Sequence, residues 1–173
     1  YSISPKIVGI GEIGLDYYWD KSFNDLQKEV FIKQVKLANE LDLPISIHDR
    51  EAHKDTFDIL TEYNKNSKVV MHCFSGSVEF MRECVKKDWY IAIGGVVTFK
   101  KAIKLKEVAK EVPLKKILLE TDAPYLTPVP YRGKTNQPAY VKYVAEEIAK
   151  LRGMSFDEIN EITTENAKDV FKI

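Results

Sequence analysis

Five short apolar runs, rich in valine and isoleucine, recur along the chain with longer amphipathic stretches between them. They cover residues 7–10, 43–47, 68–71, 90–93 and 117–119. Runs of this length and composition are typical of strands that are buried on both faces. Strands that alternate with helices form βαβ units, whose right-handed crossovers make the strands parallel. The pattern therefore predicts an α/β fold with a parallel sheet.

The stretches between these runs have helical spacing and predict helices over 24–41, 52–63, 78–85 and 102–111. In the first helix, the buried face is expected to consist of Leu26, Val30, Leu37 and Leu41. After the last strand, Pro138 suits the first turn of a helix that Gly153 caps at its C-terminus. Ser155 and Glu158 have the spacing of a capping box, which predicts a helix that carries Ile159 and Ile162 and is followed by a last amphipathic turn around Val170 and Phe171.

Charge and length exclude several classes of protein. The 173 residues predict a single domain over 1–173, and 26 Lys and Arg balance 26 Asp and Glu, so a charged ligand must be recognised locally. Two cysteines make a poor disulfide framework, and no apolar stretch approaches the roughly 20 residues that span a bilayer. We expect a soluble, cytoplasmic protein with no membrane partner. The chain begins at Tyr1, and we expect it to be incomplete at its N-terminal side.

Metal-capable side chains follow four of the five apolar runs. Glu12, His48, His72 and Asp122 are each expected at the carboxyl end of a strand, where parallel α/β folds place their catalytic groups. The fourth run ends in Gly94-Gly95, which suits the close approach of a ligand or another part of the chain. Imidazole and carboxylate together suit zinc, manganese or a similar divalent ion. The set predicts a metal site.

Each of these residues has a simpler explanation when it is taken alone, since carboxylates often cap helices and single histidines are usually core or surface groups. The joint occurrence at equivalent strand ends favours the metal site. His53 lies outside this pattern, and we expect a surface residue. Cys73 follows His72 directly, so on a strand it would point to the opposite face. We expect Cys73 to be a core thiol.

Four segments resemble the TatD family of metal-dependent deoxyribonucleases: Gly-Glu-Ile-Gly-Leu-Asp-Tyr at 11–17, Leu-Pro-Ile-Ser-Ile-His-Asp-Arg-Glu-Ala at 43–52, Met-His-Cys-Phe-Ser-Gly-Ser at 71–77 and Leu-Glu-Thr-Asp-Ala-Pro-Tyr-Leu at 119–126. The resemblance implies a TIM-type (β/α)8 barrel with two divalent ions, zinc, magnesium or manganese, that hydrolyses phosphodiester bonds in DNA. It implies that Glu12 bridges the ions and that His48 and His72 bind one of them. Asp122 would bind the other and act as the base.

The chain departs from the family pattern in two places. The family has a His-x-His pair on its first strand, which this chain lacks, and only five of eight barrel strands are expected here. We therefore expect an N-terminally incomplete domain that is a monomer when full length. The family also usually has His and Glu at positions where this chain has Tyr131 and Gln137.

Substrate contacts are expected from Arg50, Ser75, Tyr125 and Arg132. Arg50 can bind a phosphate through its planar fork, Ser75 with Gly76 would open a helix at an anion site, and Tyr125 can stack on a terminal base. Arg132, with Lys134, would extend a basic rim. The lysines at 100, 101, 104 and 106 are expected on a solvated helix face.

The absence of net charge favours exonuclease-like attack on single-stranded or frayed ends, because wrapping long duplex DNA requires many phosphate contacts. Two alternatives remain. One is another amidohydrolase-type enzyme that cleaves a C–N or ester bond, because fold and ligands do not select the substrate. The other is an inactive metal-binding fragment, since the His-x-His ligands are missing. A substrate panel and metal analysis discriminate between these possibilities.

Overall fold

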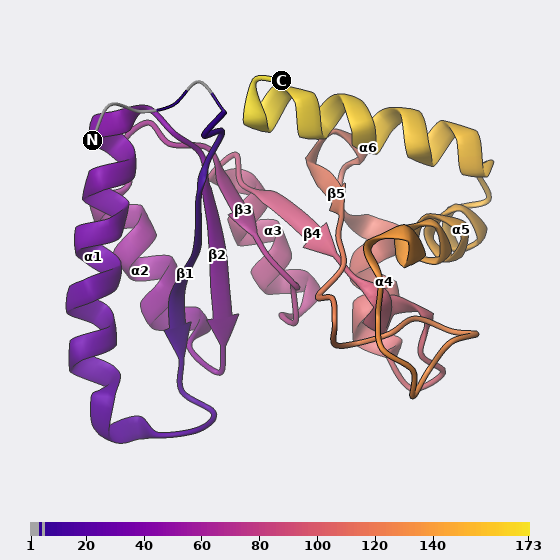
Figure 1. The fold of residues 1–173 in the computed structure, drawn as a ribbon, viewed down its shortest axis with the longest axis horizontal. Helices are drawn as coiled ribbons and strands as arrows, with labels where there is room; N and C mark the ends of the chain where they lie inside the picture. Colours follow the sequence, from indigo (N-terminus) through magenta and orange to yellow (C-terminus); the bar gives the residue numbers. More distant parts are fainter. Residues whose placement is uncertain (1–3, 5) are drawn as a thin grey trace.

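A computed structural model describes residue 4 and residues 6–173, and within them five strands form one parallel sheet (Figure 1). The strands are β1 (Ile10–Asp16), β2 (Ile45–Arg50), β3 (Val69–Met71), β4 (Tyr90–Ile93) and β5 (Ile117–Leu119). They pair in sequence order, β1-β2-β3-β4-β5. Consecutive order is the arrangement of a (β/α)8 barrel, whereas a doubly wound sheet reverses its order part-way. The predicted α/β class is confirmed.

Helices follow each strand. They are α1 (Asn24–Leu41), α2 (His53–Tyr63), α3 (Val78–Lys86), α4 (Ile103–Glu111), α5 (Val141–Arg152) and α6 (Phe156–Phe171). Short 3₁₀ turns are η1 (Lys21–Phe23), η2 (Gly95–Thr98), η3 (Leu114–Lys116) and η4 (Pro138–Tyr140). The predicted capping box of Ser155 and Glu158 is present, and Gly153 ends α5 in the left-handed conformation. Pro138 opens η4, and α5 begins three residues later.

The two faces of the sheet have different partners. On one face, strand residues such as Ile47, Met71 and Ile91 belong to a large core with residues of α1–α5. On the other face, a smaller cluster joins Val70, Tyr90, Ala92 and Leu118 to Val170 of α6. Figure 1 shows α6 crossing the sheet at the end opposite the arrowheads of β1 and β2. This arrangement leaves the carboxyl ends of the strands to polar side chains.

Two strands extend farther than expected. β1 runs from Ile10 to Asp16 and β2 from Ile45 to Arg50, so Glu12 and His48 lie within strands and not at their ends. The reason lies in the alternation of side chains along a strand. Ile13 and Leu15 are buried in the helix-covered core, whereas Glu12 belongs to the opposite set, so its charge does not end the strand.

The buried face of α1 also differs from expectation. Phe31, Val35 and Ala38 are fully buried, whereas Leu26, Val30 and Leu37 are exposed. Both sets have helical spacing, but only Phe31, Val35 and Ala38 belong to the buried core that also contains Ile13 and Leu15 of β1. Periodicity alone does not distinguish two neighbouring apolar stripes, because the choice depends on which stripe meets the sheet.

Candidate metal centre

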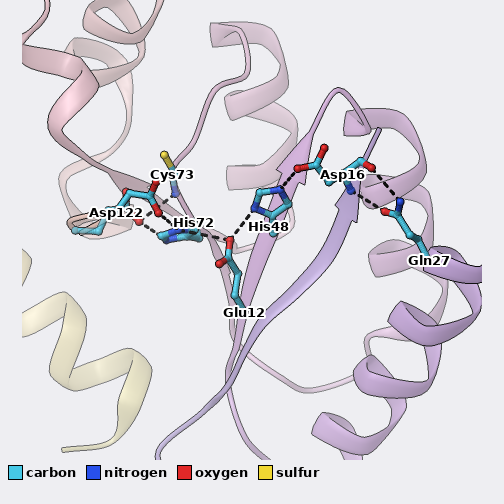
Figure 2. Close-up of polar contacts among 8 residues, drawn as sticks. Glu12, Asp16, Gln27, His48, His72, Cys73 and Asp122 are labelled. Atoms are coloured by element: carbon cyan, nitrogen blue, oxygen red, sulfur yellow. Dashed lines mark hydrogen bonds and ion pairs between the residues drawn. The ribbon is translucent and has the colours of Figure 1, made fainter. Parts of the chain in front are cut away.

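The four predicted ligands converge on one face of the sheet. Figure 2 shows the carboxylate of Glu12 between the imidazoles of His48 and His72. Glu12 Oε1 lies 2.7 Å from His48 Nδ1 and 3.6 Å from His72 Nε2. Asp122, three residues past β5, places Oδ1 3.7 Å from the same Nε2 of His72. Residues from four segments, separated by up to 110 positions (122 minus 12), are therefore neighbours.

His48 lies between two carboxylates. Its Nδ1 faces Glu12, and its Nε2 is 3.0 Å from Oδ2 of Asp16. Gln27 on α1 holds the backbone of Asp16 from both sides: its Nε2 donates to the carbonyl of Asp16, and its Oε1 accepts the Asp16 N–H. An ionised carboxylate only accepts hydrogen bonds, and a neutral imidazole has a single N–H group to donate. The imidazole of His48 can therefore form a hydrogen bond with only one of its two neighbouring carboxylates. If Nε2–H donates to Asp16, the lone pair of Nδ1 is directed at Glu12.

His72 has a similar arrangement. Its Nδ1 forms a very short contact with Glu120 Oε2, which also accepts the backbone N–H of Cys73 at 3.1 Å. With the proton on Nδ1, the lone pair of Nε2 faces Glu12 and Asp122. Carboxylates that fix the outer nitrogen of a metal-binding histidine are a recurrent feature of metal sites, because they set the tautomer and ring orientation.

Glu120 and Asp16, which contact the two histidines, are candidate site residues that the sequence analysis missed. Glu120 is largely buried, and its Oε1 has no hydrogen-bond partner among the described residues. The signal was available, since Glu120 and Asp122 share one side of an extended segment and Asp16 shares one side of β1 with Glu12. Charged residues that point to the same face as proposed ligands are candidates for supporting them.

Charge and burial perturb two of these groups. Burial lowers the pKa of His72, but the hydrogen bond to Glu120 and the neighbouring carboxylates outweigh burial and raise the pKa overall. Burial raises the pKa of Asp122, and the charges of Glu120 and Glu12 add to the rise against the opposing effect of His72. A carboxylate with a raised pKa is a better proton acceptor than an ordinary aspartate. Asp122 is thus suited to general-base chemistry.

The donor set fits a divalent ion. Two neutral imidazole nitrogens and two carboxylates match the ligands of zinc and related metals, and atoms bonded to one ion at ~2.1 Å lie roughly 3–3.5 Å apart. The contacts of Glu12 and Asp122 with the imidazoles measure 2.7, 3.6 and 3.7 Å. Within residue 4 and residues 6–173, no three of these groups yet converge at the spacing of a closed site.

The glycines that end β4 provide space for this centre, as predicted. A Cβ added to Gly94 would overlap Oε1 of Glu120, and one added to Gly95 would overlap the carbonyl oxygen of Leu126. At Gly95 a larger residue is excluded because the clash is with backbone, whereas at Gly94 a larger residue would displace the carboxylate of Glu120. Gly94 specifically allows the carboxylate that holds His72 to lie against β4.

The centre opens into a cleft of about 1080 Å³. Of the predicted substrate contacts, Arg50, Ser75 and Tyr125 line this cleft, whereas Arg132 is not among its lining residues. The guanidinium of Arg132 instead lies 3.7 Å from the centre of the Phe99 ring. Arg50 is stacked 3.8 Å from the ring centre of Tyr18, which holds it at the rim. Arg132 thus packs against Phe99 and does not line the cleft.

Two expectations near the cleft were wrong. Ser75 and Gly76 do not open α3, because the helix begins at Val78 and Ser77 is its N-cap, accepting the N–H of Phe80. Cys73 is not a core thiol but lines the cleft. It has a φ of 43°, so the alternation of a strand does not apply to it. Burial, with the charges of Glu120, Asp122 and Glu12, raises the pKa of Cys73 to about 12, which keeps the thiol protonated.

The lysine cluster also differs in part from expectation. Lys101 and Lys104 line the cleft, whereas Lys106 pairs with Glu147 at 2.6 Å and Lys100 is exposed outside the cleft. Only part of the cluster is therefore the solvated face that the sequence predicted.

His53 is partly exposed, close to expectation, but it is not an isolated surface group. Its Nδ1 lies 2.8 Å from Oδ2 of the buried Asp49, and its ring stacks on Phe80. The hydrogen bond to Asp49 raises the pKa of His53 above its ordinary value, against the opposing effect of burial.

This pair predicts a pH-dependent contribution to stability. A histidine whose folded pKa is raised stabilises the fold fully below the ordinary pKa of 6.5 and loses that contribution as pH rises through the raised pKa. The urea midpoint of the native protein should therefore exceed that of His53→Gln most clearly at pH 5.5. The difference should shrink towards pH 8.5. A difference that grows with pH would contradict this assignment.

Comparisons with known proteins agree with this geometry. A family model described as TatD related DNase matches residues 2–172. The chain is 57% identical over 173 residues to the uncharacterized metal-dependent hydrolase YabD of Bacillus subtilis, covering 99% of this chain and 68% of the relative. It is 42% identical over 168 residues to the uncharacterized metal-dependent hydrolase YcfH of Escherichia coli K12, covering 96% of this chain and 63% of the relative.

Solved structures that are similar to this chain are also described as TatD homologues or TatD family proteins. The crystal structure of YjjV, a TatD homologue of Escherichia coli K12, superimposes with a TM-score of 0.92 at 32% identity, covering 98% of this chain and 65% of that chain. A hydrolase TatD family protein of Entamoeba histolytica gives a TM-score of 0.81 at 25% identity, over 96% of this chain and 64% of that one. This chain thus spans about two thirds of the length of the proteins that it matches. Their likeness extends through all five strands described above.

Proposed function

Because the chain belongs to the TatD related DNase family, we propose that it forms the greater part of a metal-dependent hydrolase that cleaves phosphodiester bonds in DNA. One observation carries the proposal. His48 and His72 each have one ring nitrogen held by an outer carboxylate, and their other nitrogens face Glu12 from two sides. Such an arrangement prepares two imidazole lone pairs for a cation.

In this proposal Glu12, His48, His72 and Asp122 hold two divalent ions, zinc, magnesium or manganese. Bound ions of this kind lower the pKa of a water and neutralise charge on phosphate oxygens. Asp122, whose Oδ1 lies 3.7 Å from His72 Nε2, would accept the proton that the attacking water loses. Glu120 and Asp16 keep the imidazoles in the tautomer that presents a lone pair. Arg50, Ser75 and Tyr125 contact the DNA from the cleft wall.

The test is a substrate panel on the full-length protein. Single-stranded DNA, a carboxylic ester and an N-acyl amide are each incubated with Zn²⁺, Mg²⁺ or Mn²⁺, with EDTA as the control. Chelator-sensitive release of nucleotides from DNA supports the proposal. Hydrolysis of only the ester or amide would assign a different reaction to the same ligands. For residues 1–173 alone, fewer than one bound ion per chain, together with no chelator-sensitive nuclease activity, would support the alternative of an inactive metal-binding fragment.

We further propose attack at single-stranded or frayed ends, because the chain has no net charge with which to wrap duplex DNA. Rapid linearisation of closed circular DNA would contradict exonuclease-like action. Within residue 4 and residues 6–173, none of the helices combines the length and apolar character required to cross a bilayer. Monomeric state and cytoplasmic location stay predictions.

A further inference from the structure

Gln27 lies at the start of the side of α1 that packs against the sheet. It precedes Phe31 by one helical turn, and Phe31, Val35 and Ala38 continue the same side of the helix as fully buried residues. Gln27 itself is half-buried. A polar side chain in such a position requires hydrogen-bond partners, because an unpaired amide away from water costs free energy.

The amide of Gln27 finds both of its partners on one residue. Its Nε2 donates to the carbonyl oxygen of Asp16 at 3.0 Å, and its Oε1 accepts the Asp16 N–H at 2.8 Å (Figure 2). The next residue, Tyr17, donates its N–H in the other direction, to the carbonyl oxygen of Arg50 at 2.9 Å. Gln27 therefore binds the edge of β1 that faces away from β2, as a neighbouring strand would.

The side chain of Asp16 contacts a proposed metal ligand. Asp16 Oδ2 lies 3.0 Å from His48 Nε2, and Asp16 Oδ1 accepts the N–H of Tyr18 at 2.9 Å. Both carboxylate oxygens thus have a partner, and a rotation of the carboxylate would break both contacts. The position of Oδ2 beside the imidazole therefore depends on the position of the Asp16 backbone.

That backbone needs support from outside the sheet. Asp16 is the last residue of β1, and within residue 4 and residues 6–173 this strand pairs with β2 alone. The strand of His48, in contrast, has a partner on each side. The side chains of His48 and Asp16 are 36% and 27% exposed, so burial does not hold them in place. The amide of Gln27 supplies a lateral contact at the end of the edge strand.

We propose that Gln27 is a positioning residue of the metal centre, which acts through Asp16 on His48. Its amide holds the end of β1 so that the Asp16 carboxylate keeps the Nδ1 lone pair of His48 directed at a cation. The inference rests on the proposed function and extends the centre to α1, a helix that contributes no ligand. Coupling is reciprocal: if the Gln27 contacts raise the affinity for a cation, binding of the cation must strengthen those contacts.

The reciprocal effect is tested without any substitution. The side-chain amide signals of Gln27 and Gln34 are followed by NMR in the metal-free, full-length protein as Zn²⁺ is added. Gln34 is the matched control, since it is half-buried two turns further along α1 and its side chain forms no hydrogen bond within the described part of the chain. The Gln27 amide should exchange more slowly with solvent when Zn²⁺ is bound, whereas Gln34 should not change. Equal behaviour of the two amides would overturn the inference.

Substitution tests the path through Asp16. Gln27→Met keeps the length of the side chain but forms neither hydrogen bond, and its dissociation constant for Zn²⁺ should rise about tenfold, the lower end of the range for an outer residue. Gln34→Met should bind Zn²⁺ as the native protein does. In Asp16→Ala, which lacks the carboxylate, adding Gln27→Met should cause no further loss, because residues that act through one path are not additive.

A purely structural role of Gln27 gives a different pattern. Gln27→Met would then lower the thermal unfolding temperature of the metal-free protein but leave the dissociation constant for Zn²⁺ unchanged. Such a result, or a full additional loss in the double variant, would contradict the positioning role. If Gln27→Met does not fold, the amide exchange of the native protein decides the question.

Failure of the proposed function is recognised separately, by measuring hydrolysis of single-stranded DNA with the same proteins. Zn²⁺ binding that depends on Gln27, without cleavage of DNA by any divalent metal, would contradict the nuclease activity and leave the positioning role. Cleavage of DNA together with native Zn²⁺ affinity in Gln27→Met would contradict the positioning role and leave the nuclease activity. A native protein that binds no divalent metal would contradict both.

Discussion

Replacement of Asp122 by asparagine in the full-length protein should reduce kcat by about 10²–10⁴-fold, the range for loss of a general base. The amide keeps the shape of the side chain, but it has no charge for a metal and accepts no proton. The carboxylate is 3.7 Å from His72 Nε2 and has a raised pKa, so it is both close to the centre and able to take a proton.

Turnover is measured with single-stranded DNA, and thermal unfolding checks that the fold is retained. His53→Ala provides the comparison, since His53 pairs with Asp49 and is not a lining residue of the cleft. It should leave metal affinity near the native value. A near-native kcat for Asp122→Asn would remove Asp122 from the reaction. A loss of metal affinity in His53→Ala as large as that in His48→Ala would place His53 in the centre.

Glu120→Gln should lower metal affinity by about 10–100-fold, the range observed when an outer carboxylate is removed from a metal-binding histidine. Glutamine presents either an amide N–H or a carbonyl to Nδ1 of His72, and it removes the charge that favours the required tautomer. The effect should appear in the dissociation constant, measured by competition with a chromophoric chelator.

The matched control for Glu120→Gln is Glu146→Gln, because Glu146 is exposed on α5 away from the cleft. It should bind metal as the native protein does. Glu120→Asp should restore part of the affinity if charge is the important property. Native affinity in Glu120→Gln would show that Glu120 only fills the space beside Gly94.

The sequence predicted that the proposed ligands lie close together, because each lies in or shortly after an apolar strand, where position along the chain implies position in space. Glu12, His48, His72 and Asp122 are neighbours as expected, although two lie within their strands. The supporting carboxylates were harder to predict. Glu120 acts on His72 of β3 from the segment after β5, and that contact depends on the space left by Gly94 on β4.

Several of the incorrect predictions relied on local patterns in the sequence, whereas contacts between distant segments determine the structure. The buried stripe of α1 is selected by its contact with β1, which favours Phe31 and Val35 over Leu26. Cys73 leaves the strand alternation through a positive φ that no residue type in the sequence demands. Lys101 and Lys104, expected on a solvated helix face, line the cleft.

The pairing of β1 with β2 has a consequence for folding fidelity. Gly14 is opposite His48 and Asp16 is opposite Arg50, with an irregularity between Ile10 and Ile13. A slip of one residue in either strand would turn its polar side chains towards the helices and separate Glu12 from His48, since successive side chains alternate between faces. Misaligned molecules would then lose the shared donors. Tight metal binding would therefore stabilise molecules with correctly aligned strands relative to misaligned molecules.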